Sequence, residues 1–512
     1  MTIKTIVAAL LLGATSLSVF AVNPKREMRS TWLTSVENID WPSVRGVGDS
    51  IQQVQKKELC VILDSLEAIN MTSTCLQVRS MADAMYPSKY APWSYYLTNE
   101  RGVDPGWNPL EFFVNEAHKR GIEAYVWLNP YRWAQELRWN TPMDKAWKDA
   151  DMFITGDDGE YVTFNPALPA TRKLIVNVVT EILENYAVDG IIFDDYFYPG
   201  GGTTEGENAP DIEEYKSSGT SMPIGDWRRR NVNDMVADVY NAIQSIKPYV
   251  RFGISPAGVT RQSAEDYGVN TDLLGVARDW QYDKIYSDPL TWYVEGTVDF
   301  VSPQLYWKTD HKTNPFSPLS DWWSETAQQY NRHFYASHAV YYLAKEPTRA
   351  NMEEMGQQVM CCRQHTENNA AGSIYFSTKN VNGPAAARLG QYLKEDLYAT
   401  PALVPVVEWK RGKEYDHVEN VNLSQEGVLS WTAPLNADDA LIRYTVYAVP
   451  DGVAMDKALA ADGDGLDVKY LQKVVYGTSY QIPVDKQKGY WYVVRAYDGY
   501  GREHNPISIG MN

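Results

Sequence analysis

The chain has 512 residues, of which 44% are hydrophobic, and carries a formal net charge of −18 at pH 7. This length is enough for two or three domains with a large buried core, and the negative charge argues against nucleic acid or an anionic membrane as a partner. Amphipathic rings outnumber plain ones, with 35 Tyr and 17 Trp against 12 Phe. Such rings suit wet, concave surfaces that stack on a ligand, and sugars are the ligand that they suggest.

The first 21 residues, MTIKTIVAALLLGATSLSVFA, predict a secretory signal peptide cleaved after Ala21. The apolar run is short and no stop-transfer pattern follows it, which disfavours the alternative of a transmembrane anchor. No cysteine lies at the predicted cleavage point, so a lipid anchor of the usual bacterial kind is not expected. We therefore expect an exported protein, periplasmic or secreted, that does not insert into the membrane.

From residue 28 to 400, short apolar runs alternate with amphipathic helical segments. Strands are predicted at 28–34, 73–79, 122–129, 188–194, 250–256, 299–306, 334–342 and 372–377. Helices are predicted at 51–69, 108–120, 168–186, 227–247, 318–332, 351–365 and 384–397. Asn108-Pro109 is a typical helix start, and Gly121 follows the end of the same helix. Eight βα units in about 370 residues predict a (β/α)8 TIM barrel over 22–400, with a doubly wound sheet as the alternative.

Two further features of this region bear on its chemistry. Residues 200–226 are polar, Gly-rich and poor in helix signals, and they follow the fourth predicted strand, so they should lie on the active face. Of the four cysteines, Cys361 and Cys362 are neighbours and Cys60 lies on a predicted helix, which favours free thiols over two disulfides. No CxxC or histidine cluster predicts a metal site, and nothing in the sequence implies a cofactor or a protein partner.

The pattern changes near Pro401. Residues 401–512 contain alternating segments such as IRYTVYAVP and YWYVVRAYD between polar turns, which predict an immunoglobulin-like β-sandwich. Trp431, Tyr444 and the segment 492–498 resemble a fibronectin type III module. The acidic segment 462–467, DGDGLD, does not have the spacing of a twelve-residue calcium loop, so a solvated turn is favoured.

Polar residues recur where the predicted barrel strands end, which is where TIM barrels place their active sites. The residues concerned are Arg79, Asp83, Asn129, Tyr131, Arg132, Asp194, Asp195, Tyr196, Ser255, Gln304, Tyr306, Trp307 and Ser377. Each also has a structural explanation, such as an ion pair, a turn or packing, but their recurrence at one end of successive strands favours function. For His338 a hydrogen-bonded core position is favoured, and for Asp288 a helix cap.

Two adjacent acids follow the fourth strand in VDGIIFDDYFYP (188–199). Side chains alternate between the faces of a regular strand, so Asp194 and Asp195 should not both point into one pocket. We expect Asp194 to face the barrel axis, on the same side as Ile192 and Tyr196. Asp195 should then face the loops or helices and pair with a base such as Arg132 or Arg228.

Several motifs, in order along the chain, resemble the glycosyl-hydrolase-like family 10 of bacterial envelopes. They are MRSTWLTSVENIDWPS (28–43), VRSMADAMYPSKYAPWSYYLT (78–98), WLNPYR (127–132), VDGIIFDDYFYP (188–199), GISPAG (253–258) and VSPQLYW (301–307). The resemblance implies an exported TIM-barrel protein that hydrolyses glycan strands, including those of peptidoglycan; the lipoprotein cysteine that members often carry is absent here. The fourth motif also resembles the DGxDxDxExP strand of chitinase-type barrels, with Asp194 on the third acid. Tyr196 replaces the catalytic glutamate, which disfavours a substrate-assisted chitinase mechanism.

Hydrolysis of a glycosidic bond usually requires two carboxyl groups. We expect Asp194 to be the nucleophile or base, with its partner either Asp83 or, if a bulge turns it inward, Asp195. The predicted substrate contacts are Trp32, Arg79, Asn129, Tyr131, Tyr196, Tyr198, Gln304, Tyr306 and Trp307. The predicted function is an exported glycoside hydrolase acting on a polysaccharide, with peptidoglycan glycan strands as the first candidate. The alternative is a non-catalytic glycan-binding protein that uses the barrel cleft as a lectin-like site.

Overall fold

The computed structural model describes residues 24–135, 138–200, 202–269, 271–274, 279–365, 370–383, 387–459 and 465–510. The predicted signal peptide and residues 462–464 of the acidic turn lie outside these ranges. Within them, no helix combines the length and the apolar character needed to cross a membrane.

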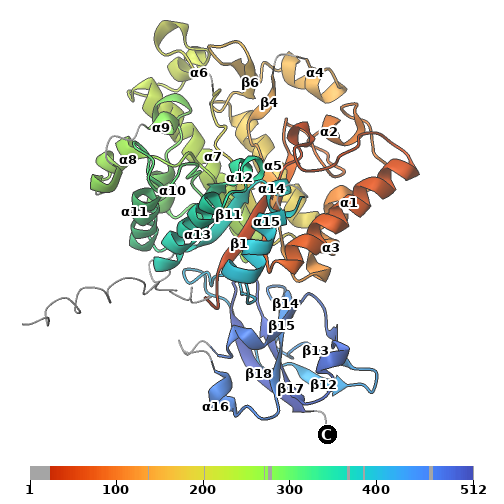
Figure 1. Cartoon of the computed structure of the whole chain (residues 1–512). Helices are drawn as coiled ribbons and strands as arrows, with labels where there is room; N and C mark the ends of the chain where they lie inside the picture. Colours follow the sequence, from red (N-terminus) through yellow and green to blue (C-terminus); the bar gives the residue numbers. More distant parts are fainter. Residues whose placement is uncertain are drawn as a thin grey trace, which may run out of the picture.

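Eight parallel strands form a closed barrel, which confirms the predicted TIM-barrel fold (Figure 1). Around the barrel the strand order is β1-β11-β10-β9-β8-β7-β3-β2. Their bounds are β1 Met28–Leu33, β2 Ser73–Arg79, β3 Glu123–Leu128, β7 Gly190–Phe193, β8 Arg251–Ile254, β9 Phe300–Val301, β10 His333–Ala339 and β11 Ala370–Phe376. Each coincides with a predicted strand, although β9 is much shorter than expected.

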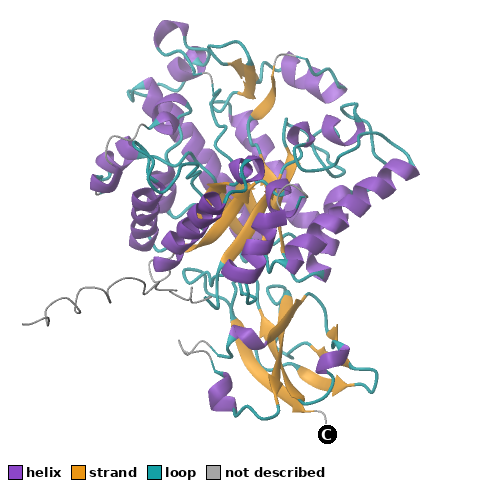
Figure 2. Cartoon of the chain, in the orientation of Figure 1, coloured by secondary structure: helices purple, strands orange, loops and turns teal. Residues whose placement is uncertain are grey.

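Helices surround the barrel (Figure 2). Those that match a predicted helix are α1 Asp49–Ala68, α3 Pro109–Lys119, α5 Pro169–Asn185, α7 Ile224–Ile246, α11 Phe316–Gln329, α13 Arg349–Gln364 and α15 Ala387–Tyr392, the last continued by a π-helix at Leu393–Leu397. Shorter helices are α2 Tyr95–Thr98, α4 Pro142–Asp149, α6 Ile212–Ser217, α8 Arg261–Asp266, α9 Trp280–Lys284, α10 Pro289–Glu295, α12 Tyr341–Lys345 and α14 Lys379–Asn382. The caps explain several starts: Asn108 accepts from the backbone N–H of Glu111, and Asp288 caps α10 as predicted.

Large side chains fill the barrel interior. The interior cluster contains Met28, Trp32, Cys75, Tyr125, Trp127, Ile192, Phe300, Tyr335 and Ile374. This packing explains two glycines in neighbouring strands. A Cβ on Gly190 would lie 2.1 Å from the Tyr125 ring, and one on Gly253 would lie 2.2 Å from the Phe300 ring. Only glycine leaves room for those rings, so the apolar strands β7 and β8 each contain one.

The chain between β3 and α5 forms a small antiparallel sheet of order β4-β6-β5, which was not predicted. It consists of β4 Arg132–Gln135, β5 Phe153–Thr155 and β6 Tyr161–Phe164. The prediction that residues 200–226 are poor in helix was wrong in part, because α6 lies within them and α7 begins at Ile224. A buried ion pair of 2.6 Å between Arg228 of α7 and Asp211 at the start of α6 anchors this segment.

The cysteine prediction is confirmed, since all four cysteines are free thiols. Cys75 and Cys362 are buried, whereas Cys60 and Cys361 are half-buried. Burial raises the pKa of the Cys75 and Cys362 thiols to about 12, so they remain protonated and behave as small apolar groups.

The C-terminal part is all-β, as predicted. One sheet has the order β12-β13-β16 and the other β15-β14-β17-β18. Their bounds are β12 Glu419–Leu423, β13 Val428–Thr432, β14 Arg443–Pro450, β15 Leu471–Val475, β16 Ser479–Gln481, β17 Tyr490–Tyr497 and β18 Glu503–Gly510, with the short helix α16 Met455–Ala458 after β14. Trp431 packs edge-on against Tyr444, with ring centroids 5.3 Å apart. The resemblance to fibronectin type III modules stays a prediction.

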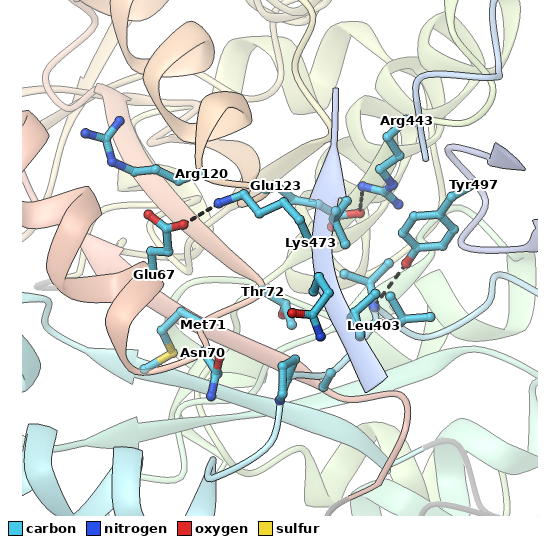
Figure 3. A pocket seen from close by; sticks show the side chains of 17 residues that line it. Glu67, Asn70, Met71, Thr72, Arg120, Glu123, Leu403, Arg443, Lys473 and Tyr497 are labelled. Atoms are coloured by element: carbon cyan, nitrogen blue, oxygen red, sulfur yellow. Dashed lines mark hydrogen bonds and ion pairs between the residues drawn. The ribbon is translucent and has the colours of Figure 1, made fainter. Parts of the chain in front are cut away.

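The C-terminal sheets pack on the amino-terminal ends of the barrel strands. Arg443 of β14 pairs with Glu123 at the start of β3, and Lys410 pairs with Asp299 just before β9 at 2.7 Å. A cavity of about 280 Å³ lies at this junction, and Figure 3 shows Arg443 and Glu123 in direct contact among the side chains that line it. In Figure 1 these sheets lie at the opposite end of the barrel from β4 and β6, which follow the carboxyl end of β3. They therefore do not cover the face on which TIM barrels build active sites.

Candidate active site

A cavity of about 360 Å³ lies at the carboxyl ends of the barrel strands. Its lining residues come from the ends of most strands and the loops after them: Trp32, Thr34, Val36, Ile39, Trp127, Arg132, Asp194, Asp195, Tyr196, Ser255, Gln304, Tyr306, Tyr341 and Phe376. The volume lies within the range of ligand pockets, roughly 300–1,000 Å³. Of the predicted site residues, the structure brings together Asp194, Asp195, Trp32, Tyr196, Gln304 and Tyr306.

Both aspartates line this cavity, so the prediction that they point to opposite sides was wrong. Strand β7 ends at Phe193, so Asp194 still continues the inward side of Ile192, whereas strand alternation no longer applies at Asp195. Ile192 lies in the barrel interior, as expected. Arg228 is committed to Asp211, and Arg132 acts on both Asp194 and Asp195. The two acids therefore form a pair within one cavity.

The cavity wall changes the acidity of both groups. Burial raises the pKa of Asp194 to about 7, an effect that the Asp195 charge reinforces and the Arg132 guanidinium opposes. Burial also raises the pKa of Asp195 to about 6, against a hydrogen bond from Gln304 and the charge of Arg132. Carboxyl groups whose pKa is raised in this way can hold a proton near neutral pH, which general acid catalysis requires.

The two aspartates have different hydrogen-bond partners. The side-chain amide of Asn129 donates to Oδ2 of Asp194. Among the described residues Oδ1 of Asp194 has no hydrogen-bond partner of normal geometry, and the nearby indole N–H of Trp127 favours the ionised carboxylate. Gln304 donates through Nε2 to the carbonyl oxygen of Ser255 at 3.2 Å, and its hydrogen bond to Asp195 favours the ionised form of that carboxyl.

Aromatic rings form much of the wall. Trp32 and Trp127 meet edge-on with centroids 5.0 Å apart, and the Trp32 indole N–H donates to Oγ of Ser337 at 2.9 Å. On another side, the guanidinium of Arg132 lies 4.9 Å from the ring centre of Tyr196. Fixed rings beside carboxyl groups suit a ligand with apolar faces and hydroxyl edges, such as a sugar.

Some predicted site residues lie outside the cavity lining: Arg79, Asp83, Asn129, Tyr131, Tyr198 and Trp307. Asp83 accepts from the backbone N–H groups of Ser80 and Met81 at 2.8 and 2.9 Å, so its carboxylate stabilises a turn. Arg79 is buried beside Asp83, and burial lowers its pKa to about 10. Neither residue is retained as a candidate for the site.

The remaining displaced residues have structural roles. Tyr131 packs against Phe197, and the Tyr198 hydroxyl donates to Asp211 at 3.3 Å, so both rings are core residues. Trp307 packs over Gly258, and Asn129 lies fully buried behind Asp194. His338 is a core residue, as favoured from the sequence, with its ring nitrogens 2.9 Å from Gln358 and from Ser373.

Sequence reasoning missed part of the cavity. The missed lining residues are Thr34, Val36, Ile39, Trp127, Tyr341 and Phe376, of which Trp127 and Phe376 belong to barrel strands. Val36 and Ile39 lie within the motif at 28–43, but no alternation assigns them or Tyr341 to the cavity, because the positions of these three residues depend on loop conformation. Within the described ranges, no group of three or more His, Cys, Asp or Glu side chains is placed to hold a metal ion.

In sequence, the chain is similar to proteins described as glycosyl hydrolases. The family model described as Glycosyl hydrolase-like 10 matches residues 27–353. Glycosyl hydrolase YngK of Bacillus subtilis strain 168 is 37% identical over 413 residues, 78% of this chain and 78% of the relative. Glycosyl hydrolase DigH of Escherichia coli K12 is 32% identical over 387 residues, 72% of this chain and 86% of the relative.

Among solved structures, the PgaB (BpsB) glycoside hydrolase domain from Bordetella bronchiseptica covers 72% of this chain and 99% of its own, with 11% identity and a TM-score of 0.46. A likeness of that degree carries no argument about function.

Proposed function

The chain belongs to the Glycosyl hydrolase-like 10 family, and on that premise we propose that it is an exported glycoside hydrolase that cleaves O-glycosidic bonds of a polysaccharide. The observation that carries the proposal is the placement of Asp194 and Asp195 in one aromatic-walled cavity at the carboxyl ends of the strands. Peptidoglycan glycan strands are the first candidate substrate, since the first 21 residues predict export and the motif resemblance implies hydrolysis of such strands.

The two carboxyls support an acid/base division of labour. Asp194 has the higher pKa, about 7, and therefore keeps a proton to higher pH than Asp195, at about 6. In the proposed mechanism Asp194 is the general acid, in place of the nucleophile or base expected from the sequence, and it protonates the glycosidic oxygen as the leaving sugar departs as an alcohol. Ionised Asp195 either removes a proton from the water that attacks the anomeric carbon, or attacks that carbon itself to form a glycosyl ester that water then hydrolyses. Because the groups are neighbours, the two pKa values describe the pair.

Aromatic rings and the guanidinium of Arg132 complete the site. Trp32, Trp127 and Tyr196 would hold the apolar faces of sugar residues, which fixes the scissile bond against the acids. Arg132 would favour the ionised form of whichever aspartate has lost its proton. Gln304 offers an amide for a substrate hydroxyl or acetamido group.

The proposal is tested by incubating the purified protein with peptidoglycan and a panel of polysaccharides and measuring new reducing ends. We expect Asp194→Asn and Asp195→Asn each to lose at least about 100-fold in kcat, because each removes a proton donor or acceptor. Asp279→Asn is the matched control. Asp279 is a buried helix cap outside the cavity whose pKa burial also raises to about 7. Undiminished release by Asp194→Asn would refute its role, and binding without hydrolysis of any substrate would favour a lectin-like protein.

A further inference from the structure

An unbroken chain of hydrogen bonds runs beneath the cavity from the loop after β1 to Asp194. The backbone N–H groups of Ser35 and Val36 donate to Oε1 of Gln77 at 3.1 and 2.9 Å. Nε2 of Gln77 donates to Oδ1 of Asn129 at 2.7 Å, and Nδ2 of Asn129 donates to Oδ2 of Asp194. We call Gln77 and Asn129 together the amide relay.

Backbone chemistry fixes the direction of the amide relay. An amide side chain can be turned by 180° with little change in shape, so its orientation depends on its partners. A backbone N–H can only donate, so the atom of Gln77 that faces Ser35 and Val36 must be its oxygen. Its nitrogen then faces Asn129, whose oxygen accepts, and the Asn129 nitrogen must face Asp194. Asp194 thus receives a donor at Oδ2.

The strand pattern explains why these side chains meet. Cys75, Trp127 and Ile192 point into the barrel from β2, β3 and β7, which are consecutive neighbours in the closed sheet. Two residues further along each segment come Gln77, Asn129 and Asp194. They form the next layer of the interior, directly above the apolar core, and all three are buried.

We propose that Gln77 is a positioning residue that, through Asn129, holds Oδ2 of Asp194 as an acceptor and thereby fixes the orientation of this carboxyl in the cavity wall. This proposal rests on the catalytic role proposed above for Asp194. A proton on Oδ2 would oppose the Asn129 N–H, so the proton of the acid form resides on Oδ1. The other charged or titratable groups that act on Asp194 are Arg132 of β4, adjacent Asp195 and the nearby ring of Tyr196.

The same side chain also sets one wall of the cavity. By accepting from the N–H groups of Ser35 and Val36, Gln77 fixes the loop that carries Val36 and Ile39 into the lining. Ser35 strengthens the connection, because its hydroxyl donates to the carbonyl oxygen of Gln77 at 2.8 Å. The position of the acid and the position of the wall facing it therefore depend on one residue.

The experiment follows the titration of Asp194 by carbon NMR of protein labelled at aspartate carboxyls, with the signal assigned by its loss in Asp194→Asn. Asn129→Leu removes the donor and should raise the Asp194 midpoint by about one to two pH units. Gln77→Met keeps Asn129 but removes the hydrogen bond that fixes the orientation of the Asn129 amide. It should raise the Asp194 midpoint by up to about one pH unit. Gln358→Met changes a buried glutamine outside the cavity and should leave the midpoint unchanged.

The titration requires no substrate, so it tests the amide relay separately from hydrolysis. If the protein proves to be a hydrolase, Gln77→Met should lower kcat about tenfold and move the alkaline limb of the pH profile upward, and it should also raise KM because the loop of Val36 and Ile39 is released. A midpoint shift without any hydrolysis would refute the proposed function and leave the relay standing. A folded Gln77→Met with the wild-type midpoint would overturn the role of Gln77, even if Asn129→Leu shifts it.

A measurement on the wild-type protein covers the case in which Gln77→Met does not fold. The side-chain amide signals of Gln77 and Asn129 should move with pH at the Asp194 midpoint, because each amide is polarised by the next acceptor. The movement should disappear in Asp194→Asn. Amide signals that do not respond to the titration of Asp194 would overturn the proposal.

Discussion

Arg443 of the C-terminal sheets reaches into the amino-terminal end of the barrel, where its Nη1 lies 2.5 Å from Oε1 of Glu123. Both side chains are buried, and Arg251 contacts the other oxygen of Glu123 at 2.9 Å. The carboxylate therefore lies between two arginines, one from the barrel and one from the C-terminal part. A buried charge of this kind is costly once a partner is lost.

Arg443→Met should destabilise the whole chain by about 3 kcal/mol, because it leaves Glu123 with half of its counter-charge in a buried position. The measurement is urea unfolding followed by fluorescence and circular dichroism. Arg349→Met is the control, since Arg349 pairs with Glu353 on the exposed surface of α13, and it should cost less than about 0.5 kcal/mol. An equal, small cost for both variants would show that the junction contributes no stability.

Removal of residues 401–512 should prevent the barrel from folding as a soluble monomer. The truncation uncovers Glu123 and Asp299, of which Asp299 would lose both the Lys410 ammonium and the Trp409 indole, at 2.7 and 2.9 Å. Size-exclusion chromatography and circular dichroism of a 24–400 fragment would check this, and a stable, monomeric barrel would contradict it.

The sequence predicted the barrel well because each strand carries its own apolar run and each major helix its own cap or amphipathic pattern. Because the strands could be located in the sequence, so could their carboxyl ends, and the candidate cavity lies there. The prediction failed for Asp195, since the alternation rule requires knowing that β7 ends at Phe193. It also failed for Asp83 and Tyr131, because a polar or aromatic residue after a strand can equally close a turn or fill the core.

Hydrolysis, if present, should show a bell-shaped dependence of kcat/KM on pH. Activity should rise as Asp195 ionises near pH 6 and fall as Asp194 loses its proton near pH 7, because the mechanism requires one protonated and one ionised carboxyl. The optimum is therefore expected between about pH 6 and 7. A profile that is flat from about pH 5 to 9 would contradict the assignment of both groups.

Asp194→Asn should lose activity and gain stability at alkaline pH. The folded-state pKa of Asp194, about 7, lies above its ordinary value of 3.8, so the folded protein binds this proton more tightly than the unfolded chain does. The stability that this group contributes is fully present below about pH 4 and is lost as the pH rises through 7. Asparagine does not titrate, so the variant's unfolding free energy relative to wild type should increase by about 2–4 kcal/mol between pH 4 and pH 8.

Asp279→Asn should show the same trend with activity retained, because the pKa of its carboxyl is also raised to about 7 but the residue lies outside the cavity. Urea unfolding of the three proteins at both pH values measures the effect. A difference between Asp194→Asn and wild type that does not change with pH would mean that Asp194 ionises normally in the fold and that its burial does not prepare it to act as an acid.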